Sequence, residues 1–188
     1  MVDRPHDTRG LGAAPRRAGD RGLPGPPRQQ GDRVNPTGRL LGADLQLIRT
    51  FKAPAADVWA SITESERTAR WFGPWRGDAD PMIQIQLTSE EGAPWVDVRV
   101  EACEPPRRLA LSSLDEHGAW HVELTVTETD GVSELLFVHQ RIDPASAGEV
   151  GPGWEYYLDC LVAAREGAPA PDFADYYPAM KPYYDGLG

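Results

Sequence analysis

The feature that most constrains the fold is a long amphipathic segment, residues 152–166, preceded by several segments that alternate between apolar and polar residues. One side of it carries residues at helical spacing, namely Trp154, Leu158, Leu161, Val162 and Arg165. The other side carries Glu155, Asp159 and Glu166. One face of this helix is therefore expected to be buried against the concave face of the preceding sheet. A curved sheet closed by one long helix tends to leave a pocket between them.

Five alternating segments are predicted to form one antiparallel sheet, in which each strand has a dry face and a wet face. They lie at residues 45–51, 83–87, 96–101, 120–127 and 134–142. Turn residues separate them, and Asp130-Gly131 is a strong hairpin signal. In the last segment Leu136 and Val138 point outward although they are apolar, so they could cover a loop or form a dimer contact.

Two short helices are expected between the first two strands. Pro54 suits the first turn of the first helix, and Thr63-x-x-Glu66 has the capping-box spacing that would start the second. Further on, Asp143-Pro144 predicts a short helical turn, and Gly151-Pro152-Gly153 predicts a break before the long helix. The tail after that helix is rich in tyrosine, so we expect it to pack back on the domain.

The N-terminal segment differs in composition from the rest of the chain. Residues 1–37 contain seven Arg, six Pro and six Gly without an apolar period, which predicts a disordered extension before one domain at residues 38–188. That domain holds 12 Lys plus Arg against 25 Asp plus Glu, so neither nucleic acid nor an anionic membrane is expected as a partner. With two cysteines and no long apolar stretch, the sequence favours a cytoplasmic location.

Five short motifs occur in order along the chain. They are Ala53-Pro54-x-x-x-Val58-Trp59-x-x-Ile62-Thr63, Trp71-Phe72-Gly73-Pro74, Glu104-Pro105-Pro106-x-x-Leu109, Leu135-x-Phe137-x-His139 and Gly153-Trp154-x-x-x-Leu158-x-x-Leu161. Together they resemble the START-related (SRPBCC) superfamily, specifically the group named after the activator of heat-shock-protein-90 ATPase. The resemblance covers about residues 40–185. It implies an α+β helix-grip fold, in which a curved antiparallel sheet wraps around a long C-terminal helix and two short helices follow the first strand.

The resemblance also implies a range of functions. Members of the superfamily bind lipids, steroids, plant hormones and polyketides under the long helix, and a few are cyclases or aromatases. The eukaryotic co-chaperone of the group carries an additional N-terminal domain, for which residues 1–37 are too short. We therefore expect a binding protein for a small apolar or aromatic molecule, without a cofactor. The alternatives are a cyclase- or aromatase-like enzyme using the same cavity, and a protein-interaction or co-chaperone module, with a homodimer as one form of it.

The residues expected to line the cavity are mostly aromatic, which favours flat, apolar ligands. They are Trp71, Phe72, Trp75, Leu111, Trp120, Leu124, Phe137, His139, Trp154, Tyr157 and Leu158. The same side chains could instead fill the space, because a sequence does not reveal a void. The motifs GxSxG, GxxxxGK[ST] and HExxH are absent, and no histidine triad for a metal is apparent. No catalytic residue and no metal ligand is therefore assigned, and enzymatic activity stays open.

Two polar residues share the parity of buried neighbours. His139 follows Leu135 and Phe137, so its imidazole could contact a ligand, act as an acid or base, or be satisfied by a backbone carbonyl or a nearby side chain. Arg49 alternates with Leu47 and Phe51 in the same way, so its guanidinium either extends to solvent or meets a buried carboxylate.

Overall fold

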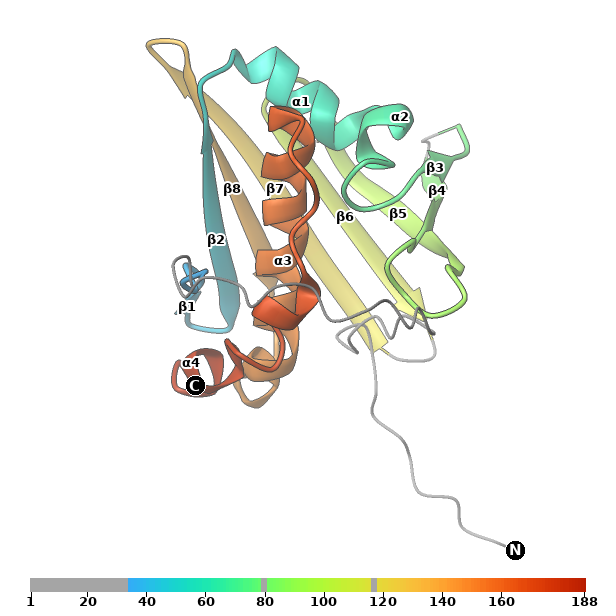
Figure 1. The fold of residues 1–188 in the computed structure, drawn as a ribbon. Helices are drawn as coiled ribbons and strands as arrows, with labels where there is room; N and C mark the ends of the chain where they lie inside the picture. The colour runs from blue at the N-terminus through green and yellow to red at the C-terminus, as the bar shows by residue number, and fades with distance from the viewer. Residues whose placement is uncertain (1–33, 79–80, 116–117) are drawn as a thin grey trace, which may run out of the picture.

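A single antiparallel sheet of eight strands curves around a long helix (Figure 1). The computed structural model describes residues 34–78, 81–115 and 118–188. The strands are β1 (Arg39–Leu41), β2 (Asp44–Phe51), β3 (Trp75–Arg76), β4 (Met82–Gln86), β5 (Trp95–Glu104), β6 (Arg108–Asp115), β7 (Gly118–Thr129) and β8 (Val132–Gln140). Their order across the sheet is β1-β2-β8-β7-β6-β5-β4-β3.

The helices lie on one face of this sheet and at its ends. They are α1 (Ala55–Thr63), α2 (Ser65–Thr68), η1 (Pro144–Ser146), α3 (Ala147–Glu166), η2 (Phe173–Asp175) and α4 (Lys181–Asp185). Figure 1 shows α3 running across the concave face, with α1 and α2 over one end of it. The expected α+β helix-grip fold is thereby confirmed. None of the helices in the described part of the chain has both the length and the apolar character needed to cross a membrane.

The predicted strands and the β7–β8 hairpin are present. Thr129 pairs with Val132, so the connecting turn is Asp130-Gly131, and both of these residues have positive φ angles, 52° and 76°. Two-residue hairpin turns of this kind need such angles, which Asp and Gly tolerate. Three further strands, β1, β3 and β6, were not predicted from the sequence. β1 and β3 are too short to show a period, and Ser112-Ser113 interrupts the alternation in β6.

The long helix begins earlier than predicted. α3 starts at Ala147 and contains Pro152, so Gly151-Pro152-Gly153 does not break it. Gly151 and Gly148 allow close packing of the tail: a Cβ atom at Gly151 would overlap the ring of Tyr184, and one at Gly148 would overlap the Asp185 carboxylate. The predicted break is therefore wrong. The glycines mark a helix surface that the tail can approach closely, rather than a boundary before the helix.

The starts of the two short helices also differ from the prediction. Pro54 is the N-cap of α1 rather than a residue of its first turn. The capping box at Thr63-x-x-Glu66 does not form, because α2 starts at Ser65 and its N-cap, Glu64, makes no side-chain capping bond. The Thr63 hydroxyl instead donates to the Trp59 carbonyl one turn back in α1, at 2.8 Å.

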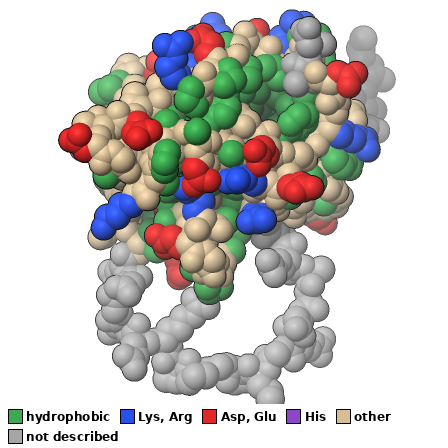
Figure 2. Space-filling view, turned by 90° about the horizontal axis from the view of Figure 1, so that it is seen from above, with side chains coloured by type: hydrophobic (Ala, Val, Ile, Leu, Met, Phe, Trp, Pro, Cys, Tyr) green, Lys and Arg blue, Asp and Glu red, His purple; other side chains and the backbone are tan. Residues whose placement is uncertain are grey.

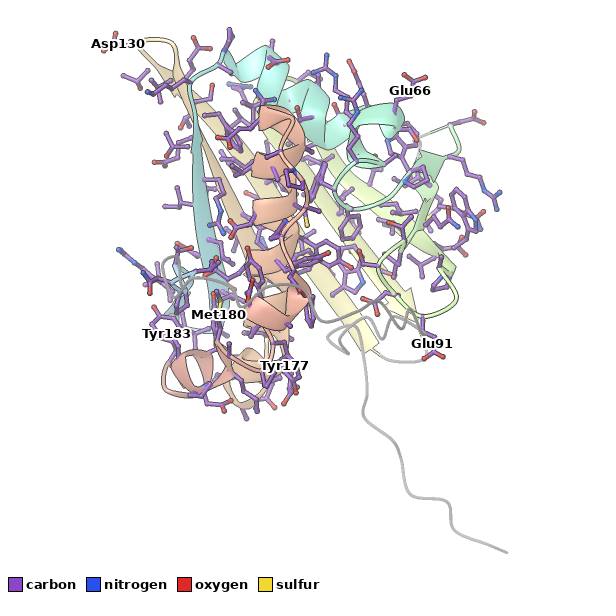
Figure 3. The ribbon with its side chains drawn as sticks, viewed as in Figure 1. Glu66, Glu91, Asp130, Tyr177, Met180 and Tyr183 are labelled. Atoms are coloured by element: carbon purple, nitrogen blue, oxygen red, sulfur yellow. The ribbon has the colours of Figure 1, made fainter. Side chains whose placement is uncertain are left out.

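The C-terminal tail packs against α3, as its aromatic content predicts. Tyr176, Met180 and Tyr184 are almost fully buried. Figure 3 shows Met180 and Tyr183 beside the lower end of α3, far from Asp130 at the tip of the β7–β8 hairpin. Most of the predicted disordered extension, residues 1–33, lies outside the described residues, whereas Val34 packs against the hydrophobic core.

A buried ion pair joins the long helix to the sheet. The Arg49 guanidinium lies 2.6 Å from the Glu155 carboxylate and 2.7 Å from that of Asp159, which realises the second of the two alternatives for Arg49. Glu155, which the helical spacing places on the side opposite the apolar stripe, is 0% exposed. It is buried because the N-terminal segment at residues 34–38 and the C-terminal tail cover this side of α3. The groups that donate hydrogen bonds to Glu155 belong to Thr37, Gly38, Arg49 and Tyr184.

Candidate functional site

A cavity of about 230 Å³ lies between α3, the sheet and the α1–β3 segment. Its wall consists of Ile62, Thr63, Thr68, Trp71, Phe72, Gly73, Trp75, Ile83, Ile85, Val100, Cys103, Leu109, Leu111, Trp120, Val122, Leu124, Phe137, Trp154 and Leu158. Figure 2 views the molecule from above. On this side, hydrophobic side chains gather at part of the surface, among charged ones.

The cavity coincides with a division of the hydrophobic core into two clusters. The larger one lies under α3, and the smaller one is formed by Ile83, Ile85, Leu87 and Val98 on the β4–β5 side of the sheet. The partly buried residues that pack against both clusters include Val100, Leu111 and Trp120, and all three line the cavity. The void is thus the gap that these two clusters leave between them.

The wall is almost entirely apolar. Its polar side chains, apart from the indole N–H groups, belong to Thr63, Thr68 and Cys103. The Thr63 hydroxyl donates to the Trp59 carbonyl at 2.8 Å, and the Thr68 hydroxyl donates to the Ser65 carbonyl at 3.1 Å. No described wall residue is a carboxylate, an imidazole, a lysine or an arginine. Such a wall suits binding of an apolar body better than acid–base chemistry.

Four tryptophans contribute indole N–H groups to the region of the wall, and three of them are paired. The Nε1 of Trp71 donates to the Ser61 carbonyl at 2.9 Å, and that of Trp75 donates to the Thr63 carbonyl at 2.9 Å.

Trp154 donates to Nδ1 of His139 at 3.1 Å. Among the described side chains, the Nε1 of Trp120 alone is buried without a hydrogen-bond partner. A buried donor left unpaired costs about 1–3 kcal/mol.

Most of the residues predicted to line the cavity do so. All of them except His139 and Tyr157 belong to the wall. Those two residues support Trp154 from outside the wall: His139 accepts its indole N–H, and the Tyr157 ring lies 6.0 Å from the Trp154 ring. Tyr157 also packs edge-on against Phe72, with ring centroids 4.8 Å apart.

Several wall residues were not predicted. Ile83, Ile85, Leu109 and Val122 face the cavity with the parity of their strands, so the alternation could have identified them. Cys103 could not be found in this way. A bulge between Val100 and Ala102 adds a residue to β5, and this shift turns Cys103 to the same side as Val100.

His139 is held as a neutral hydrogen-bond acceptor. Burial, together with the nearby charge of His121, lowers its pKa from 6.5 to about 4. Its Nδ1 is already occupied by the Trp154 indole N–H. The structure therefore supports the alternative in which a neighbouring side chain satisfies this histidine, and it gives His139 the role of positioning Trp154 in the cavity wall.

Acidification should weaken the fold through His139. Because its pKa is about 4 when folded and about 6.5 when unfolded, the unfolded chain takes up the proton first, and stability present above pH 6.5 is lost as the pH falls towards 4. Protonation also removes the acceptor for Trp154. In urea titrations between pH 7 and 4.5, His139→Gln should lose less stability than the unaltered protein. Identical pH dependence in the two proteins would rule out this role.

The described residues contain no group of three or more His, Cys, Asp or Glu side chains arranged to hold a metal ion. Outside the cavity wall, charged side chains of α1, α2 and α3 pair with each other. Arg165 donates to the Asp57 carboxylate at 2.7 Å, and Arg67 donates to the other oxygen of that carboxylate at 2.9 Å. These hydrogen bonds hold the pKa of Asp57 below its usual value.

Comparison with known proteins gives a family and several similar folds. The family model described as Activator of Hsp90 ATPase homolog 1-like protein matches residues 52–166, more than half of the chain. The crystal structure of CalU16 from Micromonospora echinospora is 27% identical with a TM-score of 0.65, and the match covers 85% of this chain and 98% of that one. No curated protein sequence matches.

Two more distant structures show the same fold. The protein encoded by gene BPP1335 of Bordetella parapertussis is 21% identical, with a TM-score of 0.61 over 84% of this chain and 93% of that one. DynU16, a protein of the dynemicin biosynthetic locus, is 18% identical, with a TM-score of 0.60 over 71% of this chain and 51% of that one.

Proposed function

The chain belongs to the family of Activator of Hsp90 ATPase homolog 1-like proteins, and from this premise we propose that it binds a small apolar or aromatic molecule in the cavity under α3. The observation that carries the proposal is the cavity itself, about 230 Å³ in volume and walled by aromatic and aliphatic side chains. Apolar ligands enter such spaces because the contact removes their surface from water.

The volume sets the size of the ligand. An apolar cavity of about 150 Å³ lined by aliphatic and aromatic residues holds benzene. The cavity here is larger, about 230 Å³, which suits a molecule of one or two fused rings. Phe72 and Phe137 lie close to Trp154, with ring centroids 6.3 and 4.4 Å from its own, so a flat ligand would meet several ring faces and edges.

Binding is better supported than catalysis or protein interaction. The described wall has no carboxylate or imidazole that could move a proton, and the imidazole of His139 faces Trp154 instead. On the outer face of the sheet, Ile48 is exposed and lies opposite Leu136, but nothing indicates which partner would cover them. A binding protein is therefore the function to test first.

Cys103 provides a direct test of occupancy. It is exposed at the cavity wall, whereas Cys160 is buried and serves as an internal reference. With naphthalene bound, alkylation of Cys103 by iodoacetamide should slow severalfold, as measured by mass spectrometry of each cysteine peptide. Cys103→Ser should bind naphthalene with unchanged affinity. If naphthalene changes neither the alkylation rate nor the tryptophan fluorescence, the proposal fails.

A further inference from the structure

Trp120 differs from the other tryptophans of the cavity wall. Trp71, Trp75 and Trp154 each donate their indole N–H to a protein acceptor, whereas the Nε1 of Trp120 is buried without one. The Nε1 atom exposes almost no surface even to a water-sized molecule, so in this conformation neither solvent nor a ligand in the cavity reaches it. Buried donors in folded proteins are nearly always paired, and an unpaired one at a cavity needs an explanation.

The rest of the wall offers little else to a polar group. The hydroxyl hydrogens of Thr63 and Thr68 are committed to the carbonyls of Trp59 and Ser65. The Cys103 thiol is only a weak donor. In the part of the wall that the structure describes, Trp120 therefore carries the one strong hydrogen-bond donor that is not already used.

We propose that the ligand of this cavity carries a neutral oxygen acceptor, such as a ketone, quinone or ether oxygen on a one- or two-ring skeleton, and that the indole N–H of Trp120 donates to it. This inference rests on the proposed binding function and adds the chemical class of the ligand. It requires the indole to rotate so that Nε1 faces the cavity and the oxygen comes within about 2.7–3.2 Å of it.

A neutral acceptor fits better than an anionic one. A buried carboxylate or phenolate needs a cationic partner, and the described wall contains no lysine or arginine. A pure hydrocarbon would fill the space but leave the Trp120 N–H unpaired. A carbonyl group would satisfy it while its ring system replaces the void with apolar contacts.

A pair of ligands with the same skeleton tests the inference. Tetralin and 1-tetralone share two fused rings, and only the second has a carbonyl oxygen. The ratio of their dissociation constants, tetralin over tetralone, should fall about fivefold in Trp120→Phe. Trp95→Phe is the control because Trp95 is exposed on β5 and does not belong to the cavity wall, so it should leave the ratio unchanged.

Two further measurements keep the test decisive. If Trp120→Phe does not fold, benzothienylalanine at position 120 keeps the ring shape without the N–H and should lower the ratio equally. In ¹⁵N spectra of the six indole groups, the Trp120 N–H resonance should move downfield with 1-tetralone and not with tetralin. If tetralin binds but the ratio and the Trp120 resonance do not respond, the inference is wrong and the binding function stands. If neither ligand binds, the binding function itself fails, and the inference with it.

Discussion

Glu155→Ala should lower the free energy of unfolding by about 3–5 kcal/mol. The Glu155 carboxylate is fully buried and forms an ion pair with Arg49, whose side chain is only 10% exposed. Removal of the carboxylate leaves that guanidinium buried with Asp159 as its remaining charged partner. It also removes the acceptor for Tyr184 and for the Gly38 backbone N–H, which lie 2.6 and 2.9 Å from it.

The loss should extend to both ends of the domain. Glu155 holds both the N-terminal segment at residues 34–38 and the C-terminal tail against α3. In Glu155→Ala, the rate of backbone amide hydrogen exchange should therefore rise at residues 34–38 and in α4 together. Burial raises the pKa of Glu155, but the hydrogen bonds from Tyr184, Thr37 and Arg49 together lower it by more, so the net shift is downward. Its stabilising effect is therefore present at neutral pH and is lost as the pH falls through this lowered pKa.

Urea denaturation at pH 7 measures the effect of Glu155→Ala. Glu166→Ala is the matched control, since it removes the same side chain from an exposed position on the same helix, and it should change stability by about 0.5 kcal/mol or less. Equal midpoints for the two variants would show that the buried carboxylate is not needed to hold the tail.

Leu111→Trp should abolish ligand binding while the protein remains folded. Leu111 lies on β6, packs against both hydrophobic clusters and lines the cavity, so an indole at this position projects into the void. The affinity for naphthalene should fall at least about tenfold, equivalent to about 1.4 kcal/mol. Overpacking of a filled core costs about 1–3 kcal/mol, whereas growth into an empty space should cost less.

The neighbouring residue supplies the control for this variant. Ala110 lies on the opposite face of β6, so Ala110→Trp adds an indole outside the cavity. Fluorescence titration with naphthalene should give an unchanged affinity for Ala110→Trp and a large loss for Leu111→Trp. Tight binding by both variants would place the ligand somewhere other than this cavity.

The sheet and most of the cavity wall could be predicted because strand alternation has a strict period of two. Once Leu124 and Phe137 are assigned to the inner face, their neighbours two residues away follow. The same reasoning fails at Cys103, because the bulge in β5 adds one residue and reverses the parity beyond it. Nothing in the local sequence announces that bulge.

The errors on α3 have a different origin. Periodicity shows which residues share a helix face, but not what covers that face. The helical spacing places Glu155 opposite the Trp154 and Leu158 stripe and gives no sign of its burial, yet distant segments bring Thr37 and Tyr184 to it. The start of the helix was misplaced for the same reason, since Gly151 is there to admit Tyr184 of the tail. Contacts between segments far apart in the chain leave no local periodic signal.

A crystal structure under xenon pressure tests the central claim most directly, because xenon enters dry apolar cavities of this size. The claim is that space persists beside Trp120, Phe137 and Trp154 under α3, although the Phe137 and Trp154 rings contact each other. At least one xenon atom should appear in the cavity against these side chains, with the surrounding side chains in place. Wall side chains that close this space, with no xenon in it, would contradict the cavity and every binding prediction that depends on it.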